Sequence, residues 1–99
     1  PSVELMTTDQ LTPAQRAGGE MILGADRSWG LGLAVVVRRG DLASVPGRFG
    51  WDGGCGTSWA SDPKEDLVGI LMTQRLFDSP SPPAVYLDFW TSTYQAIDD

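Results

Sequence analysis

The chain lacks histidine altogether and contains a single cysteine, Cys55. Without histidine it lacks the most common general base and the most common metal ligand of enzymes. A lone cysteine excludes a disulfide within the chain, and a cysteine–histidine catalytic pair cannot form inside it. We therefore expect Cys55 to be a buried structural thiol, and we expect neither a metal nor an organic cofactor. The cellular compartment stays unknown on this basis.

Basic residues and long apolar runs are also scarce. Seven lysines and arginines stand against 13 aspartates and glutamates, which gives a net charge of −6. This charge disfavours nucleic acid and anionic membrane surfaces as partners, because phosphate groups bind to cationic patches. No apolar stretch approaches the roughly 18 residues of a membrane-spanning helix.

The length of 99 residues allows one domain at most. The opening residues, Pro1 to Leu5, include no methionine and read like the interior of a longer sequence. We therefore expect residues 1–99 to be a single domain that forms the C-terminal part of a larger one.

Two segments carry helix signals. Thr12 can cap a helix that begins at Pro13, and Gln15 at its third position can complete a capping box. The pair Gly18-Gly19 predicts that this helix is short. A second helix is expected after the proline-rich break at residues 79–83, where an aromatic and apolar stripe repeats at helical spacing. Its members are Tyr86, Phe89, Trp90, Thr93, Tyr94 and Ile97.

Three strands are expected between these helices. Residues 30–37 alternate between bulky and smaller apolar side chains, which indicates a strand covered on both faces, and residues 24–29 should form a loop. The second strand should run from about residue 53 to 61 and the third from about 66 to 73, joined by a type I turn at residues 62–65. The fold class is then α+β, an antiparallel sheet of about three strands with a short N-terminal helix and a C-terminal helix packed on it. The aromatic stripe should lie across the bulky face of the sheet.

Glycines gather at the start of the expected second strand, where Gly50, Gly53, Gly54 and Gly56 fall close together. Glycine inside a strand costs stability unless another backbone or a ligand must approach closely, so the cluster indicates a sheet edge shaped for a ligand. A phosphate-binding loop is excluded, because the lysine-and-hydroxyl ending of that motif is missing and a strand follows instead of a helix.

Residues 49–59 (FGWDGGCGTSW), followed by Asp62-Pro63, resemble the superfamily of serine β-lactamases, penicillin-binding proteins and family VIII esterases, and above all its class C-like branch. In that superfamily a Lys-Thr-Gly or Trp/His-x-Gly triad opens an edge strand of the active site, and an Asp-Pro turn follows. Trp51-Asp52-Gly53 occupies the triad position. The resemblance extends over residues 29–37 and over residues 88–97, which look like the closing helix of the family.

The resemblance implies a partial β-lactamase/transpeptidase-like fold and an acyl-serine mechanism. Family enzymes acylate the serine of a helical Ser-x-x-Lys motif, and a lysine and a tyrosine transfer the protons. Ser61 and Lys64 match that motif in letters, but they fall in an expected turn, where the lysine cannot come back beside the serine as it does over one helical turn. No Tyr-x-Asn or Tyr-x-Ser occurs. The nucleophile and bases are expected upstream, and no catalytic residue is assigned within the chain.

The resemblance assigns substrate binding to five consecutive residues, Trp51, Asp52, Gly53, Gly54 and Cys55. The residue after the triad usually donates its backbone N–H to the oxyanion, which indicates Gly54, or Cys55 if the match is shifted by one. Trp51 replaces the lysine that would pair with a substrate carboxylate, which favours esterase-like or small-acyl substrates; plain packing over the glycines is the structural alternative. The Asp52 carboxylate would repel anionic substrates unless it turns away into a hydrogen bond.

These observations predict the C-terminal portion of a β-lactamase-family serine hydrolase for an ester, amide or lactam, inactive when alone. Its partners would be the small-molecule substrate of the parent enzyme and the remainder of the parent polypeptide. The alternative is a non-catalytic β-lactamase-like module that binds a ligand or self-associates. We expect self-association in any case, because a missing helical domain would expose the face of Gly30, Gly32 and Ala34 together with a strand edge.

Overall fold

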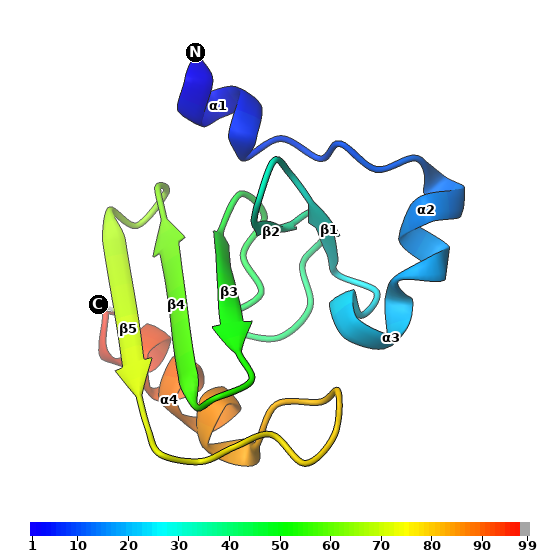
Figure 1. Cartoon of the computed structure of the whole chain (residues 1–99). Coiled ribbons are helices and arrows are strands. Elements are labelled where there is room, and N and C mark those ends of the chain that lie inside the picture. Colours follow the sequence, from blue (N-terminus) through cyan, green and yellow to red (C-terminus); the bar gives the residue numbers. More distant parts are fainter. Residues whose placement is uncertain (98–99) are drawn as a thin grey trace.

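A computed structural model describes residues 1–97 and confirms the α+β class, with five strands rather than about three. The strands form one antiparallel sheet in the order β1-β2-β3-β4-β5 (Figure 1). They are β1 (Arg27–Trp29), β2 (Ala34–Val36), β3 (Phe49–Gly53), β4 (Thr57–Asp62) and β5 (Leu67–Met72). The helices are α1 (Ser2–Met6), α2 (Pro13–Gly18), α3 (Glu20–Leu23) and α4 (Ala84–Ala96). Among these residues no helix is long and apolar enough to cross a bilayer.

The helix α2, which begins at Pro13, forms as its capping signals predict. Thr12 Oγ1 accepts a hydrogen bond from the Gln15 backbone N–H at 3.2 Å, and the Gln15 side chain accepts one from the Thr12 N–H at 2.9 Å. This capping box satisfies two N–H groups that a helix start leaves without partners. The helix α2 ends at Gly18, so it is as short as the glycine pair predicts. The sequence did not predict the short helices α1 and α3.

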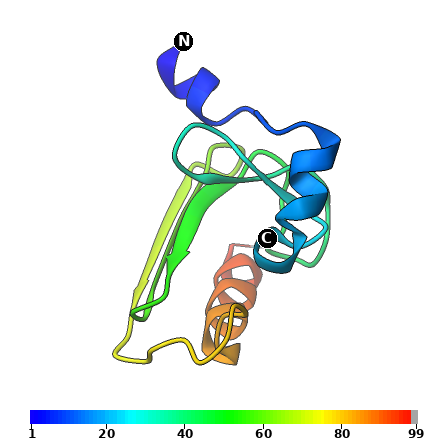
Figure 2. The ribbon, with the colours of Figure 1, turned by 45° about the vertical axis from the view of Figure 1, so that its right-hand side comes forward.

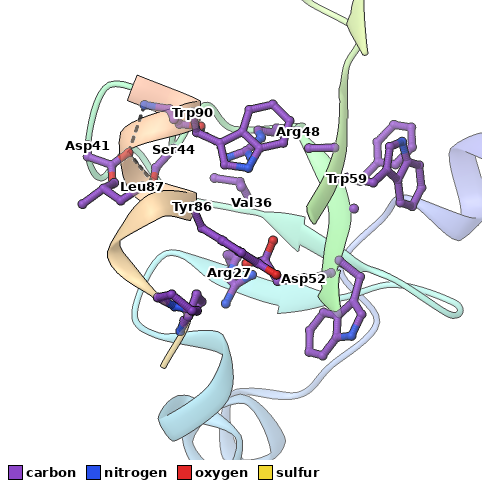
Figure 3. A pocket seen from close by; sticks show the side chains of 18 of the residues that line it. Arg27, Val36, Asp41, Ser44, Arg48, Asp52, Trp59, Tyr86, Leu87 and Trp90 are labelled. Carbon is purple, nitrogen blue, oxygen red and sulfur yellow. Dashed lines mark hydrogen bonds between the residues drawn. The ribbon is translucent and has the colours of Figure 1, made fainter. Parts of the chain in front are cut away.

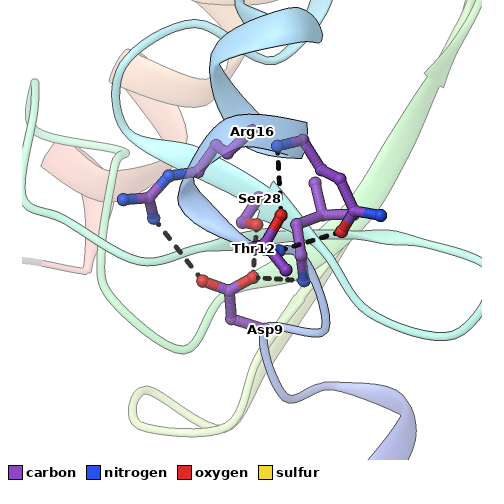
Figure 4. A network of polar contacts seen from close by, with 6 residues as sticks. Asp9, Thr12, Arg16 and Ser28 are labelled. Carbon is purple, nitrogen blue, oxygen red and sulfur yellow. Dashed lines mark hydrogen bonds and ion pairs between the residues drawn. The ribbon is translucent and has the colours of Figure 1, made fainter.

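Asp9 fastens the segment before α2 to the sheet (Figure 4). Its carboxylate accepts hydrogen bonds from the Ser28 hydroxyl of β1 and from the Leu11 backbone N–H, and it lies 3.5 Å from the Arg16 guanidinium. The Ser28 hydrogen bond is the main reason why the pKa of Asp9 is lowered, and partial burial opposes the shift. The attachment therefore depends on an ionised carboxylate.

The prediction of one strand over residues 30–37 is wrong, because a turn occupies residues 30–33 and the strand β2 covers only residues 34–36. The strand β1 lies within the expected loop of residues 24–29 and pairs with β2. Two glycines explain the turn. Gly32 has a φ of +96°, which side chains rarely adopt. A Cβ atom on Gly30 would lie 1.9 Å from the Met6 carbonyl oxygen, so the chain passes close to the N-terminal segment there.

The second half of the glycine cluster, Gly54 and Gly56, lies in a turn instead of a strand, which corrects the predicted strand over residues 53–61. The strand β3 ends at Gly53 and β4 begins at Thr57. Between them the Gly56 N–H donates to the Gly53 carbonyl at 3.2 Å, and Gly56 has a φ of +112°. The triad of residues 51–53 therefore closes β3 and does not open a strand. The strand β5 lies where the sequence predicts it. The turn before it covers residues 63–66, one residue later than predicted, and the Asp66 N–H donates to the Pro63 carbonyl at 3.4 Å.

One face of the sheet, here called the inner face, is covered by α4 (Figure 2). Strand pairing lines up one row of small residues on this face: Ala34, Gly50, Ala60 and Gly69. Trp90 of α4 packs against this row, and a Cβ atom on Gly69 would lie 2.6 Å from its ring. The large indole therefore needs the small residues, and the prediction that the aromatic stripe crosses the bulky face is wrong.

The helical stripe itself is confirmed for its three largest members. Tyr86, Trp90 and Tyr94 are at most 6% exposed, whereas Ile97 lies beyond the end of α4 and is 38% exposed. Trp90 and Tyr94 form a core cluster with Ala60 and with the loop residues Ala43 and Val45. The core therefore sits between α4, the inner face and the loop that joins β2 to β3.

The opposite face, here called the outer face, has no covering layer over β5 among residues 1–97 (Figure 2), whereas Ser28 and Val35 at its other end are buried. Its β5 residues Val68, Ile70 and Met72 are 63%, 62% and 78% exposed. The prediction that the face of Ala34 is the exposed one is therefore reversed, because α4 covers that face. The apolar surface that lacks a partner lies on the other side of the sheet.

Candidate functional site

The triad lies in the central strand of the sheet, at the end where β3 extends beyond its pairing with β2. The strand β2 pairs with β3 only at Phe49 and Gly50, whereas β4 pairs with β3 along its whole length. From Trp51 to Gly53, the side of β3 that faces β2, here called the open edge of β3, has no strand partner among the described residues. The sequence predicts a sheet edge at the glycine cluster. The structure instead shows an open stretch of a central strand, because β1 and β5 form the two edges of the sheet.

The Asp52 carboxylate turns away from this edge and toward the inner face. The Ser58 hydroxyl donates to Asp52 Oδ1 at 2.5 Å, and the Trp90 indole N–H donates to Ser58 Oγ at 2.8 Å. Ser58 is only 1% exposed, so this chain of hydrogen bonds is shielded from water. Of the two arrangements weighed from the sequence, the structure shows the carboxylate held in a hydrogen bond.

Trp51 stands at the edge with 40% of its surface exposed. Its ring packs edge-on against Trp29 of β1, with ring centroids 5.1 Å apart and an interplanar angle of 87°. The indole therefore packs against a neighbouring strand and still presents an uncharged aromatic surface to solvent.

Gly54 and Cys55 occupy the two central positions of the turn that follows the triad. The Gly54 carbonyl accepts a hydrogen bond from the Phe77 N–H at 3.0 Å, which fixes the turn against the segment after β5. Within residues 1–97 the backbone N–H groups of Gly54 and Cys55 donate to no other group. The Cys55 side chain is exposed, so the expectation of a buried thiol is wrong. The turn thus offers two fixed backbone donors on its outside.

A cavity of about 360 Å³ lies beside the triad, between the inner face, α4 and the β2–β3 loop (Figure 3). Apolar and aromatic groups make up most of its wall, including Ala34, Val36, Tyr86, Leu87 and Trp90. Asp52 also lines it, whereas Gly54 and Cys55 do not. In the described part of the chain, no cluster of three His, Cys, Asp or Glu side chains is arranged to hold a metal ion.

Arg48 is a cation in the wall of this cavity that the sequence did not single out. Its guanidinium stacks on the Trp90 ring, with its central carbon 4.2 Å from the ring centroid, and its Nη1 donates to the Ala43 carbonyl at 2.8 Å. Its Nε is buried and has no hydrogen-bond partner among the described residues. Burial lowers the pKa of Arg48, and the nearby acidic groups, led by Tyr94 and Asp52, oppose that shift.

The Asp-Pro turn is built around a buried carboxylate. Asp62 is 2% exposed and accepts hydrogen bonds from the backbone N–H groups of Lys64 and Glu65 and, at 2.6 Å, from the Tyr94 hydroxyl. Burial and this hydrogen bond to a carboxylate raise the pKa of Tyr94 far above its usual range. Ser61 lies in β4, outside any helix, so the rejection of Ser61 and Lys64 as a catalytic motif is confirmed.

Ser58 is the second residue of the site that the sequence did not identify. It lies directly opposite Asp52 across the hairpin. The sequence could have indicated this pairing, because a three-residue turn at residues 54–56 places Asp52 and Ser58 opposite each other. The assignment of residues 53–61 to a single strand concealed that pairing.

Comparison with known proteins matches this chain to the family described as Beta-lactamase over residues 2–87. Two curated relatives are similar as well: the protein named Rv1367c of Mycobacterium tuberculosis strain H37Rv and the "Uncharacterized protein MT1414" of Mycobacterium tuberculosis strain CDC 1551/Oshkosh. Each is 38% identical over 88 residues, which cover 78% of this chain and 21% of the relative. The chain thus spans about a fifth of the length of these relatives.

Proposed function

This chain belongs to the β-lactamase family, and from that premise we propose that it is the C-terminal wall of a serine hydrolase active site. In this proposal it supplies the triad strand and one oxyanion donor, while a preceding part of a larger polypeptide supplies the serine, lysine and tyrosine. The observation that carries the proposal is the pair of backbone N–H groups at Gly54 and Cys55, which have no partner within residues 1–97 and are fixed in a turn at the open edge of β3.

Backbone amides suit the role of oxyanion donors because they are oriented before the reaction begins. The Gly53 carbonyl accepts from Gly56 and the Gly54 carbonyl accepts from Phe77, so the peptide groups around the two donors cannot rotate freely. An acyl-transfer reaction develops negative charge on the carbonyl oxygen, and prearranged N–H groups stabilise that charge without reorganisation. The donor nearest the triad is Gly54, and Cys55 is the neighbouring alternative.

The side chains of the triad favour an uncharged substrate. Trp51 presents an aromatic surface where a lysine would attract a carboxylate, and Asp52 is engaged with Ser58. An ester, or another small acyl compound without a negative charge near the acyl group, fits these surroundings better than an anionic lactam. The substrate class proposed is therefore a neutral ester, with amides and lactams as poorer substrates.

The first test is labelling with a fluorophosphonate, followed by intact-mass analysis. The chain by itself should form no adduct, because no serine in it lies on a helix one turn from a lysine. When the chain is expressed together with the coding sequence that precedes Pro1, one serine should be labelled stoichiometrically. An adduct on the chain alone, or the absence of a helical Ser-x-x-Lys in the preceding coding sequence, would overturn the proposal.

A second candidate function, self-association, is favoured by the exposed outer face. The strand β5 is the last strand of the sheet and carries no charged residue or proline between Leu67 and Met72, so it lacks the usual protection of an edge strand. Antiparallel pairing of β5 with β5 of a second copy would be self-complementary and would join two apolar outer faces. We propose a second copy of this chain as the partner.

Sedimentation velocity over a range of concentrations tests this candidate. The chain should form dimers as its concentration rises, and Ile70→Ser should remain monomeric. Leu76→Ser is the matched control, since Leu76 is 66% exposed but lies outside the sheet, and this variant should dimerise like the natural sequence. A natural chain that stays monomeric at high concentration would exclude self-association and leave the hydrolase proposal untouched.

A further inference from the structure

The cavity beneath the inner face contains a cation whose hydrogen-bonding groups are only partly used. Among the described residues, Arg48 makes one side-chain hydrogen bond, from Nη1 to the Ala43 carbonyl. Within residues 1–97 its buried Nε has no hydrogen-bond partner, and no carboxylate lies within ion-pair distance of the guanidinium. A buried charge without an anionic partner is costly, so a ligand that supplies one would be bound favourably.

In the described part of the chain, Arg48 Nη2 has no hydrogen-bond partner and Nη1 uses only one of its two N–H groups, whereas Nε is buried and out of reach of a ligand. The two terminal nitrogens can together bind the two oxygens of a carboxylate with parallel hydrogen bonds. The Trp90 ring, 4.2 Å from the guanidinium carbon, holds the plane of the group in one orientation. Figure 3 shows Arg48 and Trp90 together at one end of the cavity, with Tyr86 and Asp52 farther along.

The rest of the cavity wall is apolar, which indicates an apolar body for the ligand beyond its carboxylate. Between Arg48 and the start of α4 the cavity is bounded by apolar groups: Ala34, Val36, Phe49, Ala84 and Leu87. Its volume of about 360 Å³ falls in the range of roughly 300–1,000 Å³ that small-molecule sites have. Helix α4 has 13 residues and no side-chain cap at its N-terminus, where Pro82 and Pro83 line the cavity, so its dipole adds positive potential there.

The acidic residues of the wall limit the charge that the ligand can carry. Asp52 is hydrogen-bonded to Ser58, and Asp41 accepts hydrogen bonds from the Ala43 N–H and the Ser44 hydroxyl. The second arginine, Arg27, already donates to the Leu23 and Ile22 carbonyls. One uncommitted cation faces two carboxylates, so a dianion such as a phosphate ester is disfavoured and a monoanion is the better match.

We propose that this cavity binds a small apolar monocarboxylate, with its carboxylate on Arg48 and its apolar body along β2 and the first turns of α4. The site is separate from the donors at Gly54 and Cys55, which do not line the cavity. It therefore does not require the chain to be part of a hydrolase.

Titration of the ¹⁵N-labelled chain with octanoate, followed by NMR, tests the proposal. The Arg48 Nε–H signal should move downfield and saturate, together with the Trp90 indole N–H and the amides of Tyr86 and Leu87. Octanol has the same apolar body without the charge, so its affinity should be at least about tenfold lower than that of octanoate. Equal binding of octanoate and octanol, or no saturable shift of Arg48, would overturn the proposal.

Two variants separate this site from unspecific binding to the outer face. Arg48→Lys keeps the charge but removes the paired N–H groups of the two terminal guanidinium nitrogens, so octanoate should lose about tenfold in affinity. Ile70→Ser changes the outer face only and should bind octanoate as the natural chain does. If Arg48→Lys does not fold, the comparison of octanoate with octanol on the natural chain still shows whether the carboxylate contributes to binding. Octanoate shifts confined to Val68, Ile70 and Met72 would refute the cavity site.

Discussion

The two faces of the sheet differ in how large their side chains are and in what covers them. On the inner face a row of alanine and glycine residues accepts the Trp90 indole, and Tyr86, Trp90 and Tyr94 are almost fully buried. On the outer face, apolar side chains point away from the sheet and more than 60% of each β5 side chain there is exposed. The difference teaches that the described residues close one hydrophobic layer and leave the apolar side chains of β5 on the other face exposed.

Removing the central indole should break the inner layer and have the largest effect. Trp90→Ala removes the ring that fills the small-residue row, the hydrogen bond to Ser58 and the stacking surface of Arg48. We expect the free energy of unfolding to fall by about 3–5 kcal/mol, measured by urea denaturation followed by circular dichroism. Ile70→Ala on the outer face is the control and should change it by no more than about 0.5 kcal/mol. Equal losses in the two variants would contradict the distinction between the faces.

Adding one methyl group to the inner row should have the next largest effect. Gly69→Ala would place a Cβ atom 2.6 Å from two Trp90 ring carbons, and the buried ring cannot move aside easily. We expect a loss of about 1–3 kcal/mol in the same denaturation experiment. Gly54→Ala, where nothing lies within 4 Å of the added atom, should be almost neutral. A neutral Gly69→Ala would mean that Trp90 does not sit on this row.

Tyr94 and Tyr86 form a matched pair on the same helix. Tyr94→Phe deprives the buried Asp62 carboxylate of a hydrogen bond of 2.6 Å, which should cost about 1–2 kcal/mol. Tyr86→Phe loses only a 3.4 Å contact with the Gly53 carbonyl and should cost less. The folded chain raises the pKa of Tyr94 above its value in the unfolded chain. The neutral phenol therefore adds its full share to the free energy of unfolding below about pH 10, and this share is lost as the pH rises further. Denaturation at pH 8 and pH 11 should therefore separate the two variants most at pH 8.

The smallest effect is expected at the edge of the sheet, where Asp9 holds the N-terminal segment. The folded chain lowers the pKa of Asp9, so this carboxylate stabilises the fold above about pH 3.9 and stops doing so as the pH falls below that value. Asp9→Asn should be less stable than the natural chain at pH 7 and should lose less stability between pH 5 and pH 3. The same acid sensitivity in both proteins would show that another carboxylate is responsible.

Much of the fold could be predicted from local signals. The capping box at Thr12, the turn at Asp62-Pro63 and the aromatic stripe of α4 each depend on residues close in sequence, and all three are confirmed. The glycines were harder to interpret, because the same residue serves in a strand and in a turn. Gly32 and Gly56 adopt positive φ values that end strands, and no composition signal distinguishes them from Gly50 or Gly69, which lie inside strands.

The candidate site was predictable only in part, for a related reason. The triad and its neighbouring amides follow from the motif at residues 51–55, but the cavity depends on contacts between residues far apart in sequence. Arg48 precedes Trp90 by more than 40 positions, and nothing near Arg48 in the sequence indicates that it stacks on a distant indole. The face that α4 covers also depends on long-range fit, which is why the sequence interpretation assigned it to the wrong side.

The most direct test of the central claim, that the turn after the triad supplies an oxyanion donor, is the turnover of a neutral p-nitrophenyl ester by two Gly54 variants. Both are compared in the polypeptide that joins this chain to its preceding coding sequence. Gly54→Pro removes the backbone N–H, whereas Gly54→Ala keeps it, has open space for its methyl group and does not require a positive φ. We predict that Gly54→Pro lowers kcat by roughly 10²–10³ with a smaller change in KM, while Gly54→Ala stays close to the natural protein. Equal kcat values for Gly54→Pro and Gly54→Ala, with Cys55→Pro also unaffected, would contradict the account.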